Sequence, residues 1–298
     1  MCVLFTSVRP LTRAENLKAV YDAYNGEKEY VQRTWGTDIP GLHSGRYKLM
    51  VTDELLNESP GKSIFIGHGC GAGKLYGLQQ RGTWYRPGAI DYAIASSKDT
   101  IPFVAQWCGL PESKVIPLGM PRTDAYFSAK KPEHDGKRHL YAPTFRNGRW
   151  MPDLNKVWRA LPNGHRFIVK PHMVTGNKLA SIWPNVEIAD AWKPSTPYLV
   201  DAETVITDYS SIMFDAMVLR KPVILFAKDK DRYLRERGMY LPYPERYSMR
   251  YCETEEMMVK FAVNFEWNNI DEMHREFFVG ACDGKSTART IDLIKDCL

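Results

Sequence analysis

The chain has 298 residues, of which 44% are hydrophobic and 25% are charged, and its formal net charge is +5 at pH 7. These values indicate a globular protein long enough for two cores, and the sequence holds no apolar run long enough to cross a bilayer as a helix. The charge suits an anionic substrate but is too small for a dedicated nucleic-acid binder.

Two features predict a cytoplasmic location. The apolar core of the first 15 residues is too short for a signal peptide. The six cysteines form no C-x-x-C pair and show no metal-ligand spacing, which favours free thiols in a reducing compartment.

Short apolar runs and one amphipathic segment open the chain. Strands are expected at 3–5, 30–31 and 49–52, and a helix is expected over 11–25, where apolar residues recur at helical spacing. This alternation fits one half of a nucleotide-binding α/β domain.

A strand at 63–66 runs into a glycine-rich segment at 67–74. The phosphate-loop pattern fails there, because His68 stands where its first glycine is required and Leu75 replaces the Ser or Thr. The segment does place His68 at the carboxyl end of a strand, the edge at which ligands gather in open α/β sheets. The sequence leaves open whether this histidine is a catalytic base or a structural residue.

A strand–helix–strand pattern over 90–118 completes the first half, and Gly119-Met-Pro-Arg-Thr-Asp follows it. Arg122 and Asp124 in that segment are interpreted either as part of the acceptor side or as a hinge ion pair. The polar linker 129–138, with its proline and glycine, marks the domain boundary.

The second half delivers polar residues to two further strand ends. The run His139-Leu-Tyr-Ala-Pro-Thr-Phe-Arg brings Thr144 and Arg146 to one of them, and a strand at 166–170 ends in Lys170-Pro171-His172. Arg146 could clamp a phosphate with a two-pronged contact or could be an ordinary surface residue. His172 could contact an anion or be satisfied by nearby backbone.

The stretch 204–227 reads as strand, polar turn, helix and strand. Ser210 and Ser211 open the helix, and they either cap it or help to hold a phosphate at its amino end. The chain after residue 253 is expected to be helical.

Several of these segments resemble the CDP-glycerol glycerophosphotransferase family, the teichoic-acid polymerase type. The resemblance is most specific in TDYSSIMFDAMVLRKPVILFAKDKDRY and RGMYLPY, and the pairs His68-Gly69 and Lys170-x-His172, the Gly-x-Pro-Arg-x-Asp segment and Tyr-Ala-Pro-Thr-x-Arg agree with it. It covers about residues 64–243. The chain departs from the family around His68, where Gly67 precedes it and Cys-Gly-Ala follows Gly69.

The resemblance implies an α/β fold of two Rossmann-like domains in the glycosyltransferase-B architecture. An acceptor-side domain over 1–128 and a donor-nucleotide domain over 139–298 are expected, with the final helices packing back on the first. It also implies that His68 is the catalytic base, with Gly69, Arg122 and Asp124 on the acceptor side. The residues implied to bind the donor diphosphate are Arg146, Lys170, His172, Thr207, Ser210 and Ser211.

The expected reaction is transfer of a glycerophosphate or related group from a nucleotide-diphosphate donor such as CDP-glycerol to the hydroxyl of an acceptor, for which a polymer is one candidate. No metal is expected, since the sequence has no Asp-x-Asp pair placed to hold one. No other cofactor and no transmembrane segment are expected either. The alternative is a nucleotide-sugar transferase acting on a polymer such as hydroxylated DNA, because the chain is basic and 12% aromatic.

Overall fold

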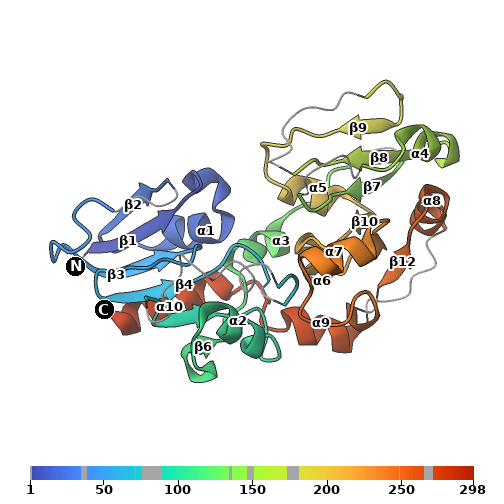
Figure 1. The fold of residues 1–298 in the computed structure, drawn as a ribbon. Helices are drawn as coiled ribbons and strands as arrows, with labels where there is room; N and C mark the ends of the chain where they lie inside the picture. The colour runs from blue at the N-terminus through green and yellow to red at the C-terminus, as the bar shows by residue number, and fades with distance from the viewer. Residues whose placement is uncertain are drawn as a thin grey trace. The chain divides into compact units, whose positions relative to one another are not determined.

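The computed structural model describes residues 2–34, 39–70, 72–75, 89–133, 136–145, 151–172, 181–247, 249–264 and 271–298. Two parallel six-stranded sheets with flanking helices form the fold, which confirms the predicted α/β class (Figure 1). The chain divides into unit 1, Met1–Ser128 with Glu276–Leu298, and unit 2, Ala129–Arg275. Unit 1 is therefore built from both ends of the chain.

Unit 1 contains a sheet in the order β2-β1-β3-β4-β5-β6. Its strands are β1 Cys2–Ser7, β2 Lys28–Gln32, β3 Tyr47–Thr52, β4 Lys62–Phe65, β5 Tyr92–Ile94 and β6 Val115–Ile116. Its helices are η1 Leu11–Arg13, α1 Glu15–Ala23, α2 Ile101–Cys108, η2 Glu112–Lys114, η3 Pro121–Thr123, α3 Asp124–Ser128 and α10 Ser286–Cys297, and α9 Glu272–Val279 crosses the boundary between the units.

Both faces of the unit 1 sheet are apolar, as expected for parallel strands covered on each side. Val3 and Phe5 of β1 pack with residues of α1 and α10, including Leu17 and Ile294. Leu4 faces the opposite side and belongs to a second cluster. The C-terminal helix therefore contributes to the core that the first strand begins, and α1 lies against α10.

Unit 2 contains a sheet in the order β12-β11-β10-β7-β8-β9. Its strands are β7 Lys137–Tyr141, β8 His165–Val169, β9 Val186–Ile188, β10 Thr204–Thr207, β11 Val223–Phe226 and β12 Arg250–Cys252. Its helices are α4 Leu154–Ala160, α5 Thr196–Asp201, α6 Ile212–Val218, α7 Lys230–Glu236, η4 Glu245–Tyr247 and α8 Glu255–Val263. Every residue of β10 and β11 is buried, and α4 and α8 cover one face of the sheet.

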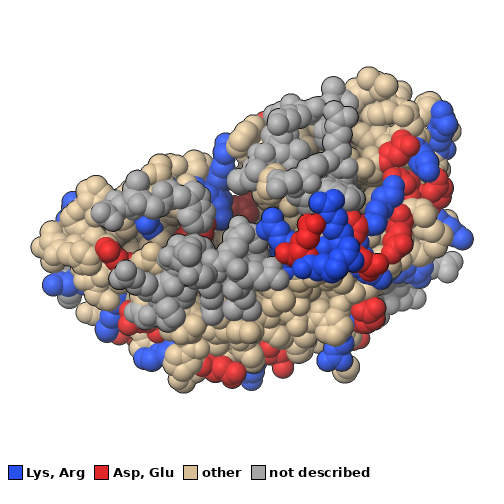
Figure 2. All heavy atoms as spheres, viewed as in Figure 1, with Lys and Arg blue, Asp and Glu red and all other residues tan. Residues whose placement is uncertain are grey.

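The helix α7 of unit 2 carries charges of both signs. Figure 2 shows Lys and Arg side chains interspersed with Asp and Glu over this helix. One of these pairs, Arg232 with Glu236, joins Nε to Oε1 at 2.7 Å one helical turn apart. This face is therefore not a block of one sign, and the net charge of the chain is not concentrated there. Across the described residues, no helix combines the length and apolar character that crossing a bilayer requires.

Two histidines, His139 and His165, link strands β7, β8 and β10 of unit 2 by side-chain contacts. His139, 1% exposed, contacts Thr204 through Nδ1, and its Nε2 lies 2.8 Å from Nδ1 of His165. Burial, and next the neighbouring His165, lower the pKa of His139 to about 4. The folded unit therefore favours the neutral imidazole.

We expect the stability of unit 2 to fall as the pH drops from about 6.5 to about 4. His139 titrates near its ordinary pKa in the unfolded chain, so protons bind the unfolded state first and the loss approaches about 3 kcal/mol. Urea unfolding at pH 7, 6 and 5 measures this slope. The variant His139→Gln should flatten it, and an unchanged slope in that variant would contradict the assignment.

Candidate functional site

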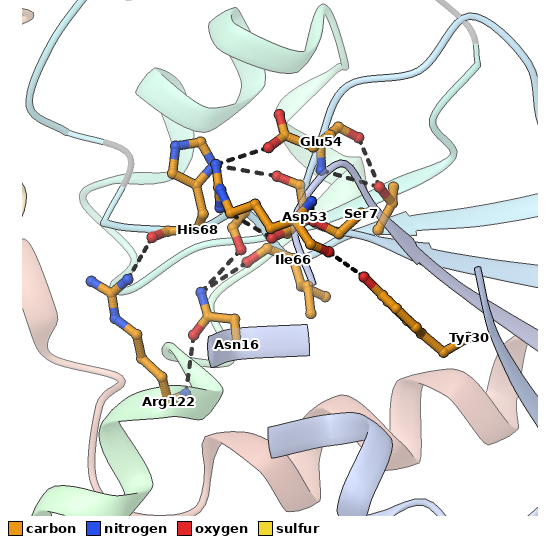
Figure 3. Close-up of polar contacts among 11 residues, drawn as sticks. Ser7, Asn16, Tyr30, Asp53, Glu54, Ile66, His68 and Arg122 are labelled. Carbon is orange, nitrogen blue, oxygen red and sulfur yellow. Dashed lines mark hydrogen bonds and ion pairs between the residues drawn. The ribbon is translucent and has the colours of Figure 1, made fainter. Parts of the chain in front are cut away.

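The carboxyl ends of β1, β3 and β4 meet at one edge of the unit 1 sheet, because these strands are parallel neighbours. Four polar side chains follow these strands: Arg9 after β1, Asp53 and Glu54 after β3, and His68 after β4. Figure 3 shows Asp53, Glu54 and His68 close together. The sequence predicted only the last of them.

One guanidinium serves two carboxylates in this group. Nη1 of Arg9 lies 3.2 Å from Oδ2 of Asp53, and Nη2 lies 2.8 Å from Oε1 of Glu54. Asp53 is 1% exposed and Glu54 is 9% exposed. Burial raises the pKa of both carboxyls, that of Glu54 to about 7, although the charge of Arg9 opposes the rise.

His68 is oriented by a backbone carbonyl. Its Nδ1 lies 3.4 Å from the carbonyl oxygen of Asp53, which can only accept, so Nδ1 carries the proton and Nε2 keeps its lone pair. The ring also meets Trp107 edge-on, at 6.1 Å between centroids. Burial first, and then the charges of Arg9, Arg122 and Lys74, hold the pKa of His68 well below its usual 6.5. The imidazole is therefore neutral at pH 7, as a general base must be.

The backbone around His68 is held by side chains from distant segments. Arg122 donates from its guanidinium to the carbonyl of His68, and its backbone N–H donates to Oδ1 of Asn16 at 3.0 Å. The buried Asn16 in turn donates from Nδ2 to the carbonyl of Gly67 at 3.0 Å. Gly67 has φ +59°, a left-handed conformation that favours glycine. Gly69, predicted on the acceptor side, is half-buried.

Asp124 has a contact that the sequence did not indicate. Its Oδ1 accepts from the backbone N–H of Ser286 at 3.0 Å, and its Oδ2 accepts from that of Thr287 at 2.7 Å. Both amides belong to the first turn of α10. Asp124 thus caps the C-terminal helix, whereas the sequence interpretation paired it with Arg122 at a hinge or placed it on the acceptor side.

In unit 2, β7 and β10 are neighbouring parallel strands, and a buried carboxylate joins the loops that follow them. Oδ1 of Asp208, a fully buried residue, accepts from the backbone N–H of Thr144 at 2.8 Å and from that of Tyr209 at 2.6 Å. The hydroxyl of Tyr243 donates to the carbonyl of Asp208 at 3.2 Å. This frame fixes the loop that leads to Ser210.

Ser210 and Ser211 come directly before α6, and both are partly exposed. Oγ of Ser210 accepts from the backbone N–H of Ile212 at 3.5 Å, at the long limit for a hydrogen bond. Their position at the carboxyl edge of the sheet agrees with the placement expected from the sequence.

Two other residues predicted to bind the nucleotide donor, Thr207 and Lys170, have side chains that donate hydrogen bonds to backbone carbonyls. Thr207 is fully buried and its hydroxyl donates to the carbonyl of Ala142 at 2.7 Å, which joins β10 to the end of β7. Lys170 is 5% exposed, and its Nζ donates to the carbonyl of Ala191 at 3.1 Å. These bonds give both side chains a structural role. His172 is half-buried with its ring 5.8 Å from that of Phe145.

Arg146, the predicted phosphate clamp, lies outside the described residues. Within the described part of the chain, no three His, Cys, Asp or Glu side chains lie where they could hold a metal ion together. Metal independence therefore stays a prediction.

Two threonines of this edge make a matched pair for a stability measurement. Thr144 is 9% exposed, and its hydroxyl has no hydrogen-bond partner among the described residues, whereas that of Thr207 is paired. We expect Thr207→Val to lower the free energy of unfolding by about 1–3 kcal/mol, because it leaves the carbonyl of Ala142 short of a donor. Thr144→Val should be neutral or slightly stabilising, because it removes a hydroxyl that is buried without a partner. Urea titration of both variants measures the difference, and equal losses would contradict the assignment.

The sequence profile of the CDP-glycerol:poly(glycerophosphate) glycerophosphotransferase family matches residues 62–296. A teichoic acid poly(ribitol-phosphate) polymerase of Bacillus spizizenii is 27% identical over 264 residues, which are 78% of this chain and 42% of that protein. A teichoic acid glycerol-phosphate primase of Bacillus subtilis is 24% identical over 274 residues, which are 84% of this chain and 72% of that protein. The chain spans about half the length of several of the curated relatives it matches.

The wall teichoic acid polymerase TagF has the same fold. Its structure matches with a TM-score of 0.76 at 20% identity, covering 99% of this chain and 88% of that one. A histidine-to-asparagine variant of that polymerase soaked with CDPG matches with a TM-score of 0.75 at 20% identity, covering 100% and 89%. These likenesses confirm the predicted glycosyltransferase-B architecture.

Proposed function

The chain belongs to the CDP-glycerol:poly(glycerophosphate) glycerophosphotransferase family, and from this premise we propose that it transfers a polyol phosphate from a CDP-activated donor to an acceptor hydroxyl. The observation that carries the proposal is His68, held neutral at a strand end with its Nε2 lone pair available. The relatives described above act on teichoic acids according to their names, which supports a polyol-phosphate acceptor.

In this proposal the acceptor oxygen attacks the β-phosphorus of the donor. A new O–P bond forms, the bond between that phosphorus and the bridging oxygen breaks, and the electron pair leaves with CMP. Nε2 of His68 takes the hydroxyl proton, a role suited to a neutral imidazole. His68 belongs to unit 1, and the residues assigned to the CDP donor belong to unit 2.

We assign donor binding to Ser210, Ser211, His172 and Arg146. Charge develops on the transferred phosphoryl group and on the leaving CMP. Hydrogen-bond donors that the protein holds in position before the reaction stabilise such charge strongly. The loop that carries the serines is fixed by Asp208 before any ligand arrives. Thr207 and Lys170 would stabilise this edge of the sheet through their hydrogen bonds to backbone carbonyls, without contacting the donor.

A cytoplasmic location and independence of metal ions are parts of the same proposal. The six cysteines are buried thiols, in keeping with a reducing compartment. Sugar transfer to hydroxylated DNA, the alternative predicted from composition, gains no support from the names of these relatives, and the charges on α7 are mixed.

The test is a donor comparison with purified protein. CDP-glycerol, CDP-ribitol and UDP-N-acetylglucosamine are supplied with a polyol-phosphate acceptor, and the release of CMP or UDP is followed with and without EDTA. We expect acceptor-dependent CMP release that EDTA does not reduce. Release of UDP alone would overturn the choice of donor, and loss of activity in EDTA would overturn metal independence.

A further inference from the structure

Arg9 is held at both ends of its own backbone. Its N–H donates to Oγ of Ser7 at 3.0 Å, and its carbonyl accepts from the hydroxyl of Tyr30. The side chain is 23% exposed and reaches the turn that follows the neighbouring strand β3. These two bonds fix the backbone position from which the two terminal nitrogens of the guanidinium, the guanidinium fork, reach Asp53 and Glu54.

The turn after β3, which carries Asp53 and Glu54, is held by its own hydrogen bonds. Oγ1 of Thr52 donates to the carbonyl of Glu54 at 3.0 Å and accepts from the N–H of the same residue at 3.1 Å. The fork then binds the carboxylates of Asp53 and Glu54, one with each terminal nitrogen. Two carboxylates and one guanidinium leave this buried group with excess negative charge whenever both acids are ionised. Burial raises the pKa of Glu54 to about 7, and the charge of Asp53 adds to the rise.

The carbonyl that accepts from Nδ1 of His68 belongs to Asp53, so the fork fixes the residue that sets the tautomer. We infer that Arg9 is a positioning residue for His68. Its ion pairs with both carboxylates keep the Asp53 carbonyl within reach of Nδ1, so that Nε2 remains the nitrogen that accepts the proton. This inference rests on the base role proposed for His68.

The charge of Arg9 acts on the same ring. Among the described residues, the charged groups near His68 are Arg9 after β1, Asp53 and Glu54 after β3, Lys74 at the end of the glycine-rich segment, and Arg122 in η3. From α2 the ring meets the indole of Trp107, which carries no charge. Removing the guanidinium takes away a positive charge that disfavours the imidazolium form of His68. The pKa of His68 should therefore rise.

Two substitutions separate the fork from the charge. Arg9→Lys keeps a cation but cannot bridge both carboxylates with fixed geometry. We expect kcat to fall about 10- to 100-fold, with the donor KM and the pH profile unchanged, because a misplaced ring costs rate at every pH. Arg9→Met removes the charge as well, so its kcat/KM should fall further at pH 6 than at pH 8.

Nitrogen-15 NMR of the histidine rings tests the inference without turnover. In the wild type, His68 should show the Nδ1–H tautomer and stay neutral down to pH 6. In Arg9→Met it should show mixed tautomers and a higher pKa. The matched control is Arg46→Met, since Arg46 also pairs with a glutamate in unit 1, Glu29 at 2.7 Å, but its side chain is 61% exposed.

A wild-type tautomer and pKa in Arg9→Met would overturn the inference. So would a loss of rate that is equal at all pH values and explained by a smaller folded fraction, measured by circular dichroism. The failure of the base role is distinguishable from this failure: turnover retained in His68→Ala would overturn the base role, while the NMR result on Arg9 would still stand.

Discussion

Replacing His68 by Ala should lower kcat for polyol-phosphate transfer by about 10²- to 10⁴-fold, the range that a positioned general base supplies. The dissociation constant of the CDP donor should change little, because the donor site is assigned to unit 2 and His68 belongs to unit 1. Rapid-quench measurement of CMP release gives the rate, and isothermal titration calorimetry with the donor gives the affinity.

The control for this variant is His43→Ala. His43 belongs to the same unit, but its side chain is 65% exposed and pairs with Glu58 at 3.3 Å, so its loss should leave both constants unchanged. Turnover retained in His68→Ala would rule out the base role. A rate loss accompanied by an equal loss of donor affinity would instead assign His68 to binding.

The pH profile adds a second signature of the same residue. Because the pKa of His68 lies well below 6.5, the ring stays neutral as the pH falls from 8 to 6. The contribution of His68 to kcat/KM should therefore be flat over that range and decline only at lower pH, as protonation blocks Nε2.

The second large effect is expected at Asp208. In Asp208→Ala two buried amides, those of Thr144 and Tyr209, lose an ionised acceptor, and each such bond contributes about 1.5–3 kcal/mol. We expect the free energy of unfolding of unit 2 to fall by about 3–5 kcal/mol. Donor affinity should fall more than 10-fold, because the loop carrying Ser210 and Ser211 is no longer fixed. Chemical denaturation and calorimetry measure the two quantities on one preparation.

Asp190→Ala is the matched control for Asp208→Ala. Asp190 also accepts from a backbone amide, that of Trp192 at 2.9 Å, but in an exposed turn of unit 2. Its loss should lower the free energy of unfolding by less than about 1 kcal/mol and leave donor affinity unchanged. Normal donor affinity in the folded fraction of Asp208→Ala would show that the donor does not use this loop.

Most strands of both sheets could be predicted from the sequence, because a parallel strand covered on both faces needs a nearly continuous apolar run. The runs that form β1, β10 and β11 are of this kind. α7 and β12 were not predicted: the first is mostly charged and the second has three residues. The single helix expected over 11–25 is instead a short 3₁₀ turn followed by α1.

The candidate site was predictable only where it depends on local order. The strand-end position of His68 follows from an apolar run and the glycines after it. Arg9, however, lies 44 residues from Asp53 in the chain, and no local pattern joins the two. The direction of the Thr207 hydroxyl could not be read either, because all of β10 is buried and no alternation of polar and apolar residues marks its faces.

The two-ended construction of unit 1 has a consequence for biosynthesis. Strand β1 is synthesised before unit 2, but the core it belongs to also needs Ile294 and Cys297, which are synthesised after unit 2. The contiguous segment Ala129–Arg275 holds all of its own strands and can fold while translation continues. Unit 1 can therefore close its core only after all of unit 2 has been synthesised, so the segment made earlier matures later.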